Sequence, residues 1–337
     1  MTPLVPMEAV LADELPDGEG WQFEPKWDGF RCIAVRSGKA VELWSKSGKP
    51  LARYFPEVEA MFARLATREF ILDGELLIVT RGTVAFDALQ LRLHPAESRI
   101  RKLSAETPAM FMAFDCLTEG KVMLGSKPLA DRRSALERLV ATEGGLMLQL
   151  SPATRDRDHA LGWLDRTGGA LDGVIAKRLD LPYRPGERAM VKVKQRRTAD
   201  CVVGGFRYGA KGGQVGSLLL GLYDDAGLLH HVGYTSSIAA RDRQQWTDEL
   251  EALVGAPGFT GNAPGGPSRW ATARSMEWQP LRPELVVEVR YDQVTGRRFR
   301  HGTALLRWRP DKSPKQCKFE QLAPELRPSE IAELFGA

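Results

Sequence analysis

The segment Glu24-Pro25-Lys26-Trp27-Asp28-Gly29 constrains this chain more than any other part of its sequence. It ends an extended, largely apolar run, Trp21–Lys26, and a second such run, Phe30–Arg36, follows directly. Runs of this length and composition predict two short strands with a turn at Asp28-Gly29, since glycine lets the backbone turn tightly. A lysine is therefore expected at the end of a strand, beside a close turn.

Lys26 in this position is a candidate covalent nucleophile toward a nucleotide α-phosphate. Asp28 could orient the amine or the ribose of the nucleotide, and Gly29 would let the backbone come close to the ligand. A string this short also occurs by chance, and a lysine within it is more often an ordinary surface residue. The interpretation therefore depends on what the rest of the chain contains.

The composition is that of a folded globular protein of two or three domains: 337 residues, 43% hydrophobic and 27% charged. Its apolar runs fall short of the ~20 residues that span a bilayer, and residues 1–6 lack the pattern of a signal peptide. The four cysteines form neither a C-x-x-C metal pair nor a disulfide framework. We therefore expect a reduced cytoplasmic protein without structural metal or membrane contact.

The net charge is only +4, but basic residues gather in two regions. These are Lys177, Arg178, Arg184, Arg188, Lys192, Lys194, Arg196 and Arg197 in the first, and Arg290, Arg297, Arg298, Arg300, Arg307, Arg309, Lys312, Lys315 and Lys318 in the second. Regions of this kind suit phosphate binding, with a solvated surface as the alternative.

Up to about Arg197 the pattern mixes strands with helices. Helices are expected after Pro56 and after Asp131, which could cap the second of them. Further strands are expected at Val41–Ser45, Phe70–Asp73 and, after an interruption at Gly74, Leu76–Thr80, then at Met110–Leu117, Val174–Ala176 and Met190–Lys194. This order is α+β with antiparallel sheets rather than a regular βαβ alternation.

After Thr198 the chain becomes rich in short strands and glycine-containing turns, with one helix at about Ala239–Val254. The strands are expected at Cys201–Arg207, Ser217–Asp224, Leu229–Thr235 and Leu285–Tyr291. This pattern favours a small β-barrel of the OB type, with another small β-domain as the alternative. The predicted domains are 1–196 and 197–337, with a hinge at Gln195–Asp200.

Five more strings resemble pieces of a functional site, and each has an ordinary structural interpretation when taken alone. In chain order they are Leu72-Asp73-Gly74-Glu75-Leu76, Phe111-Met112-Ala113-Phe114-Asp115, Asp172-Gly173-Val174-Ile175-Ala176-Lys177, Val191-Lys192-Val193-Lys194 and Arg307-Trp308-Arg309-Pro310-Asp311-Lys312. Together with the Lys26 string, in fixed order across two domains, they are hard to attribute to chance.

In that order the sequence resembles the covalent nucleotidyltransferase superfamily of ATP-dependent DNA ligases, RNA ligases and mRNA-capping enzymes, over roughly Leu4 to Leu322. It is most similar to the short bacterial ligase C type and to the ligase domain of end-joining ligase D. The resemblance implies an adenylation domain (nucleotidyltransferase, ATP-grasp-like) of antiparallel sheets and helices, followed by a β-barrel OB-fold domain.

The resemblance also implies roles for single residues. Lys26 matches the lysine that attacks ATP and becomes lysyl-AMP, and Lys192 and Lys194 would disfavour its ammonium form while neutralising phosphate charge. The remaining nucleotide positions are Glu24 at the base edge, Arg31 and Glu75 at the ribose, Phe114 stacked on adenine, and Arg188 near the phosphates, while Asp28 stays a candidate for orienting the amine or the ribose.

Glu75 and Asp172 are the metal ligands that the resemblance implies, for Mg²⁺ or Mn²⁺. Asp172 departs from the family, which has glutamate there, so its contact with the metal could run through water. Lys46 stands where the family has an arginine touching DNA phosphate, and loses the bidentate geometry of arginine. Arg309, Asp311 and Lys312 match the motif that covers the ATP triphosphate.

The sequence therefore predicts an ATP-dependent DNA ligase that seals nicks in duplex DNA through lysyl-AMP and DNA-adenylate intermediates. We expect a nucleoid-associated monomer working in DNA repair, beside a repair polymerase, a primase or an end-binding protein. One alternative is a capping guanylyltransferase or RNA ligase. Another is a catalytically silent DNA-binding module, which the intact set of Lys26, Glu75, Lys192 and Lys194 disfavours.

Overall fold

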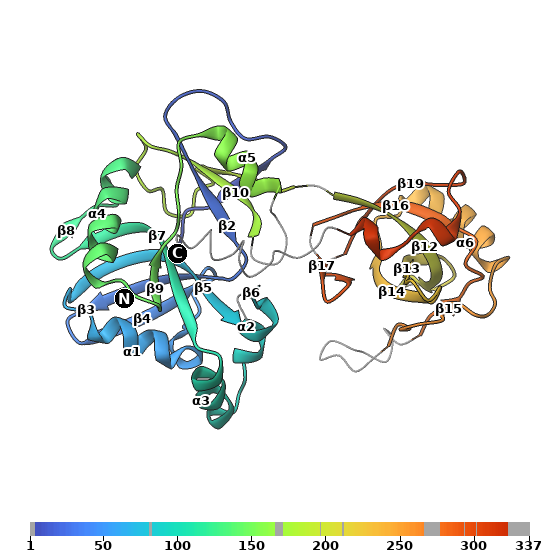
Figure 1. Ribbon diagram of the computed structural model, residues 1–337, viewed down its shortest axis with the longest axis horizontal. Coiled ribbons are helices and arrows are strands. Elements are labelled where there is room, and N and C mark those ends of the chain that lie inside the picture. Colours follow the sequence, from blue (N-terminus) through green and yellow to red (C-terminus); the bar gives the residue numbers. More distant parts are fainter. Residues whose placement is uncertain are drawn as a thin grey trace. The chain divides into compact units, whose positions relative to one another are not determined.

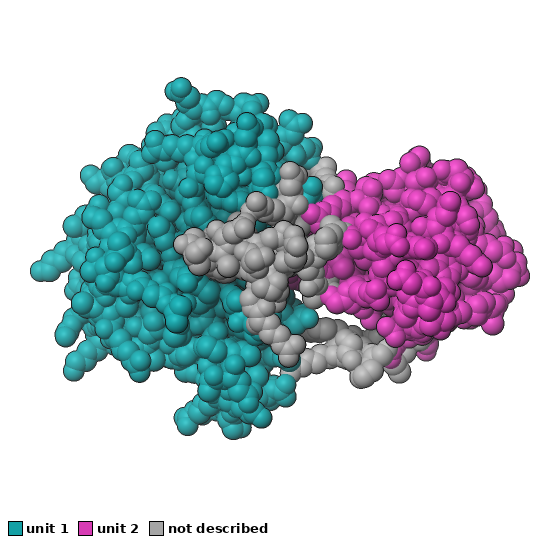
Figure 2. Space-filling model, in the orientation of Figure 1, with its two compact units in different colours: residues 1–195, 326–337 teal, residues 196–325 magenta. Residues whose placement is uncertain are grey.

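The computed structural model describes residues 4–80, 83–165, 171–195, 197–210, 212–265, 277–292, 294–300 and 302–322. These residues form two compact units, shown in teal and magenta in Figure 2. Unit 1 holds the described residues up to Gln195, and unit 2 those from Arg197 onward. None of the helices in the described part is long and apolar enough to cross a membrane.

Unit 1 contains two sheets and five α-helices among its described residues (Figure 1). A seven-stranded sheet has the order β4-β3-β5-β7-β8, with β6 and β9 paired beside that path. Its strands are β3 (Phe30–Ser37), β4 (Ala40–Ser45), β5 (Glu69–Thr80), β6 (Thr83–Val84), β7 (Ala109–Glu119), β8 (Val122–Met123) and β9 (Leu148–Leu150). The helices are α1 (Pro56–Arg64), α2 (Phe86–Arg92), α3 (Glu97–Glu106), α4 (Leu129–Glu143) and α5 (Arg157–Asp165).

The second sheet of unit 1 has four strands in the order β1-β11-β10-β2. They are β1 (Ala9–Ala12), β2 (Trp21–Trp27), β10 (Leu171–Arg178) and β11 (Met190–Val193). An apolar cluster joins the two sheets, since Phe23 and Val174 of the smaller sheet and Leu77 and Met112 of the larger sheet belong to one buried core. Burying apolar side chains from both sheets holds them together.

A bend lies at Asp28-Gly29 between two strands, as expected, but these strands do not pair with each other. β2 pairs with β10 in the smaller sheet, whereas β3 pairs with β4 and β5 in the larger one. The chain therefore crosses from one sheet to the other at Gly29. A Cβ atom there would lie 2.3 Å from the carbonyl oxygen of Leu76, so only glycine fits without displacing the backbone of β5.

Two further expectations about unit 1 are corrected. β5 runs unbroken through Gly74, which sits at a shift of register against β7 rather than between two strands. Helix α4 begins at Leu129 after Pro128, so Asp131 lies within its first turn and is not its cap. An acid there still interacts favourably with the positive end of the helix dipole.

Unit 2 is a β-barrel with the strand order β14-β13-β12-β16-β19. Its elements are β12 (Arg197–Tyr208), β13 (Val215–Tyr223), β14 (Leu229–Thr235), α6 (Arg243–Glu251), β15 (Gln279–Pro280), β16 (Val286–Tyr291), β17 (Val294–Thr295), β18 (Arg298–Phe299) and β19 (Ala304–Trp308). Four short 3₁₀ segments complete the described chain: Ala52–Tyr54 in unit 1, and Ala240–Asp242, Pro314–Gln316 and Phe319–Gln321 in unit 2.

The barrel closes where β14 meets the start of β19. Thr235 and Thr303 form a parallel bridge, and the Thr303 amide donates to the carbonyl oxygen of Tyr234 at 3.1 Å. The predicted helix is shorter than expected, because 240–242 form a 3₁₀ turn before α6. Residues 197–200, expected to belong to the hinge, are already paired with β16.

Replacing Gly74 by alanine is expected to destabilise unit 1 by about 1–3 kcal/mol, because a Cβ there would lie 2.4 Å from the ring of Phe111. The Met112 carbonyl oxygen, at 2.7 Å, limits the movement that could relieve this contact. Urea unfolding followed by circular dichroism measures the effect. Gly125→Ala is the matched control, since no atom lies within 4 Å of its added Cβ. Equal stability of the two variants would contradict the prediction.

Candidate active site between the two sheets of unit 1

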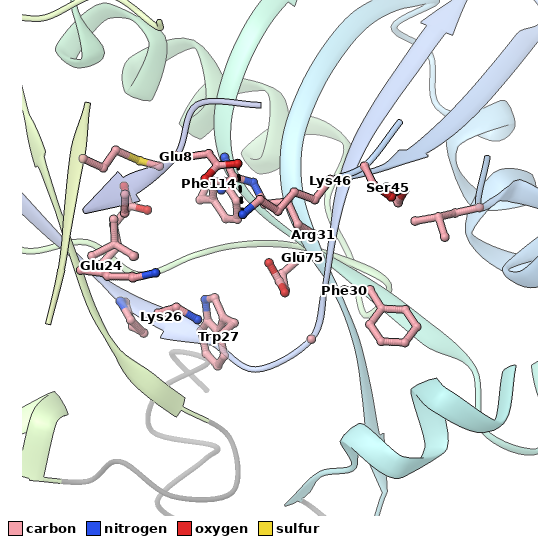
Figure 3. Close-up of a pocket in the computed structure, with 18 of the residues that line it drawn as sticks. Glu8, Glu24, Lys26, Trp27, Phe30, Arg31, Ser45, Lys46, Glu75 and Phe114 are labelled. Carbon is pink, nitrogen blue, oxygen red and sulfur yellow. Dashed lines mark hydrogen bonds and ion pairs between the residues drawn. The ribbon is translucent and has the colours of Figure 1, made fainter. Parts of the chain in front are cut away.

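A cavity of about 1070 Å³ lies between the two sheets of unit 1 (Figure 3). Of the residues predicted to form a site, it is lined by Glu24, Lys26, Arg31, Lys46, Glu75, Phe114 and Lys192. These come from β2, β3, β5, β7, β11 and the turn after β4. The fold thus gathers in one place seven residues that the sequence spreads over more than half of the chain. Asp28, Asp172, Arg188 and Lys194 are not among the lining residues.

Lys26 is held at the end of β2 by a carboxylate from the neighbouring strand. Its Nζ lies 2.5 Å from Oδ2 of Asp172, and Nζ of Lys194 lies 2.9 Å from Oδ1 of the same group. Asp172 falls at a shift of register between β10 and β2, and such a bulge changes where a side chain points. One carboxylate therefore neutralises two lysines.

Lys192 extends this cationic group and has no carboxylate at ion-pair distance among the described residues. Burial, together with the positive charges of Lys26 and Lys194, lowers the pKa of Lys192. Three lysines, Lys26, Lys192 and Lys194, therefore gather around the Asp172 carboxylate. Such a site is suited to bind a polyphosphate.

Glu75 contributes a carboxyl group from the opposite sheet. Its side chain is partly open to the cavity but closely surrounded by protein, and this desolvation raises its pKa to about 7. Lys26, Arg31 and the backbone N–H of Gly29 oppose the shift. A cation bound at Glu75 would favour the ionised form further, so the group fits an oxygen-coordinated divalent ion.

The described residues contain no cluster of three or more metal-binding side chains. Glu75 and Asp172, the metal ligands predicted from the sequence, both offer the hard oxygen donors that a divalent ion prefers, although only Glu75 lines the cavity. An ion with few protein ligands, completing its shell with water and phosphate oxygens, is typical of Mg²⁺. Both oxygens of Asp172 already contact lysines, so a metal ion would have to share or displace those contacts.

Arg31 is fixed by a buried aspartate that the sequence analysis did not select. Its Nε and Nη2 donate to the two oxygens of Asp73 at 2.7 and 2.6 Å, and the Tyr183 hydroxyl donates to Asp73 Oδ2 at 2.7 Å. The Arg31 guanidinium lies 4.9 Å from the centroid of the Phe114 ring. Asp73 stands two residues before Glu75 in the same sequence string, and this proximity is the signal that could have identified it as a site residue.

Glu24 and Lys177 form a buried ion pair at 2.8 Å, with side chains only 3% and 4% exposed. Gln22 donates to the other Glu24 oxygen at 2.7 Å. Lys177 Nζ also lies 4.7 Å from the centroid of the Phe114 ring, and all three residues Glu24, Lys177 and Phe114 line the cavity. Lys177 was missed as a site residue, although it ends the string Asp172–Lys177.

The remaining predicted residues lie at the edge of this site or in unit 2. Lys46 pairs with Glu8 at 3.2 Å, and Arg188 is exposed in the loop before β11. In unit 2, Arg309 contacts Asp311 at 2.8 Å and Asp200 at 2.9 Å, and Lys312 contacts the other oxygen of Asp200 at 2.9 Å. Asp200, which joins Arg309 to Lys312, was also missed.

Comparison with known proteins identifies the family. Residues 6–194 match the ATP dependent DNA ligase domain, and residues 211–312 match the ATP dependent DNA ligase C terminal region. The chain belongs to the ATP-dependent DNA ligase family. The predicted family, enzyme class and α+β fold with a C-terminal OB-like barrel are confirmed.

The chain is 44% identical over 338 residues to DNA ligase C2 of Mycolicibacterium smegmatis, covering 96% of this chain and 95% of that protein. It is 30% identical over 317 residues to the multifunctional non-homologous end joining DNA repair protein LigD of Mycobacterium tuberculosis, covering 92% of this chain and 37% of LigD. A solved Lig E DNA ligase has the same fold, with a TM-score of 0.55 at 17% identity over 91% of this chain and all 100% of that one.

The raised pKa of Glu75 makes stability depend on pH in a defined direction. The pKa of Glu75 is about 7 in the folded protein, against an ordinary value of 4.5. The contribution of its neutral carboxyl group to folding stability is therefore fully present below pH 4.5. This advantage is lost as pH rises through 7, at up to about 1.4 kcal/mol per pH unit. The test is urea unfolding of the unsubstituted protein and of Glu75→Gln across this range, without nucleotide or metal. The free energy of unfolding of the unsubstituted protein, relative to that of Glu75→Gln, should fall as pH rises. A constant difference would contradict the prediction.

Proposed function

We propose that this protein seals nicks in duplex DNA in three steps, with Lys26 as the covalent nucleophile. The amine of Lys26 attacks the α-phosphorus of ATP, a P–N bond forms, and the bond to pyrophosphate breaks. AMP then passes to the 5′-phosphate at the nick. Finally the 3′-hydroxyl attacks that phosphate and AMP leaves. The observation that carries this proposal is the placement of Lys26 in a cavity with Lys192, Glu75 and the stacking candidate Phe114.

Attack requires the neutral amine, because an ammonium group has no lone pair. Lys26 must therefore leave its ion pair with Asp172 before it attacks, at a place that also holds Lys192 and Lys194. The same lysines would stabilise the charge that develops on the phosphate. A divalent ion, Mg²⁺ or Mn²⁺, would supply further charge neutralisation at Glu75 and Asp172.

Glu24 and Lys177, at the proposed base-binding end of the cavity, would favour adenine over guanine. The Glu24 carboxylate accepts hydrogen bonds and the Lys177 ammonium donates them, side by side at 2.8 Å. Adenine presents an amino donor beside a ring-nitrogen acceptor, which matches this pair. Guanine presents the opposite pattern, with an oxygen that would face Glu24. This argues against a GTP-dependent capping enzyme.

The other residues predicted from the sequence complete the proposal. Arg31 and Glu75 would hold the ribose, with Asp28 beside them, while Arg188 would contact the nucleotide phosphates and Lys46 a DNA phosphate. Unit 2 would act as the OB-fold domain, 197–337, following an adenylation domain at 1–196. Arg309, Asp311 and Lys312 would cover the ATP triphosphate during the first step.

Duplex DNA would be held through its backbone, so binding should be sensitive to salt and independent of sequence. The relative LigD is named as a non-homologous end joining DNA repair protein, and this supports a repair role beside a polymerase, a primase or an end-binding protein. We propose that the chain acts as a cytoplasmic, nucleoid-associated monomer.

Replacing Lys26 by alanine should abolish the covalent AMP adduct, because the nucleophile is removed. Intact mass is measured after incubation with ATP or GTP and Mg²⁺, without DNA. The unsubstituted protein should gain one AMP with ATP alone and lose it when nicked DNA is added and sealed. Lys26→Arg keeps the charge and should also form no adduct. An adduct on either variant, or an adduct with GTP instead of ATP, would contradict the proposal.

Replacing Lys177 by glutamine should raise the KM for ATP in adduct formation by about tenfold or more, as expected for losing a charged hydrogen-bond donor. Selectivity for ATP over GTP should fall with it, which a purely structural effect would not produce. Initial rates of adduct formation with each nucleotide measure both quantities. Lys121→Gln, an exposed lysine outside the cavity, is the charge-matched control. Unchanged selectivity would exclude this role for Lys177.

A further inference from the structure

Glu8 places a negative charge among the cations at the edge of the cavity. Its carboxylate lies 3.2 Å from Nζ of Lys46, and both side chains line the cavity (Figure 3). Lys46, and to a lesser degree Arg188 and Arg31, lower the pKa of Glu8. These three cations come from separate parts of unit 1, and their charges converge on one acid.

The backbone fixes Glu8 in this position. The Glu8 amide donates to the carbonyl oxygen of Glu187 at 2.8 Å, and the Met190 amide donates to the carbonyl oxygen of Glu8 at 3.1 Å. These two bonds lie on either side of Arg188, and the chain then continues into β1, which pairs in parallel with β11. The main chain at Glu8 is therefore anchored, while its side chain is partly exposed to solvent.

The pair formed by Glu8 and Lys46 differs from the other ion pairs of the cavity in its exposure. The two side chains are 32% and 58% exposed, whereas those of Glu24 and Lys177 are almost fully buried. An exposed ion pair contributes little to folding stability and is easily broken. The Glu8–Lys46 pair therefore matters less for folding stability than for what else Lys46 can bind.

We propose that Glu8 is an internal competitor of DNA, whose carboxylate occupies the phosphate-binding position of Lys46 until a DNA phosphate displaces it. This inference rests on the proposed function, in which Lys46 contacts a DNA phosphate. A carboxylate and a phosphodiester each carry one negative charge and accept hydrogen bonds from the same ammonium group. Every duplex must then replace the internal contact before Lys46 contributes to binding.

Such competition would weaken contacts with any phosphate backbone, and these contacts supply nearly all non-specific binding. It would also reduce the dependence of binding on salt. When Lys46 moves from Glu8 to a phosphate, DNA releases a counterion but the freed carboxylate attracts one. In a variant without the Glu8 carboxylate, this counterion uptake is lost, and the net release of counterions on DNA binding increases.

The test measures the affinity of the full chain for a nicked duplex that lacks the 3′-hydroxyl, by fluorescence anisotropy between about 50 and 200 mM salt. Glu8→Gln should bind about two- to fivefold more tightly than the unsubstituted protein at low salt. The slope of log affinity against log salt should become steeper by up to about one. Glu14→Gln makes the same change in net charge at an exposed position outside the cavity and should bind as the unsubstituted protein does.

A double-mutant cycle assigns the effect to Lys46. Lys46→Gln alone should weaken binding, and adding Glu8→Gln to it should then have almost no further effect. Unchanged binding by Glu8→Gln would overturn the inference. Weaker binding would also overturn it, because it would show that Glu8 orients Lys46 for DNA instead of competing with DNA. Failure of the proposed function looks different, because the unsubstituted protein would then form no AMP adduct with ATP.

Discussion

The passage of the chain from one sheet to the other at Gly29 is the constraint on which the active site depends. Because this glycine lies against the backbone of β5, Lys26 ends one sheet directly opposite the strand that carries Glu75. Any side chain at this position would push the sheets apart or move the lysine. The apolar cluster between the sheets then sets the width of the cavity in which both residues meet.

Charges in this cavity are arranged according to how deeply they lie. The pairs Glu24–Lys177 and Arg31–Asp73 are largely buried, and removing one partner would leave an uncompensated charge, so these pairs hold a fixed geometry. Lys26 and Lys194 are more open and share the single carboxylate of Asp172. Fixed pairs thus surround the proposed base and ribose positions, while exchangeable ones surround the proposed phosphate position.

The sequence predicted which residues gather around one cavity better than it predicted how the strands pair. Seven predicted residues do line one cavity, because short motifs with unusual polar residues mark chemistry directly. The sequence did not predict that β2 and β3 belong to different sheets, since the alternation of residues marks strands but not their partners. Asp73, Lys177 and Asp200 were missed for a related reason. Each acts by holding a predicted residue in place, and such a contact exists only once the chain has folded.

Most cations proposed to touch a phosphate already have a carboxylate partner in the structure. Lys26 and Lys194 share Asp172, Lys46 has Glu8, and in unit 2 Arg309 and Lys312 share Asp200. Binding a polyanion would then exchange one anionic partner for another, and the cations would never be left unpaired. An exchange of partners costs less free energy than desolvating unpaired charges. The affinity for the polyanion would then depend on how strongly the displaced carboxylates compete for the same cations. Lys192 and Arg188 have no such partner among the described residues, and both would be available for phosphate from the start.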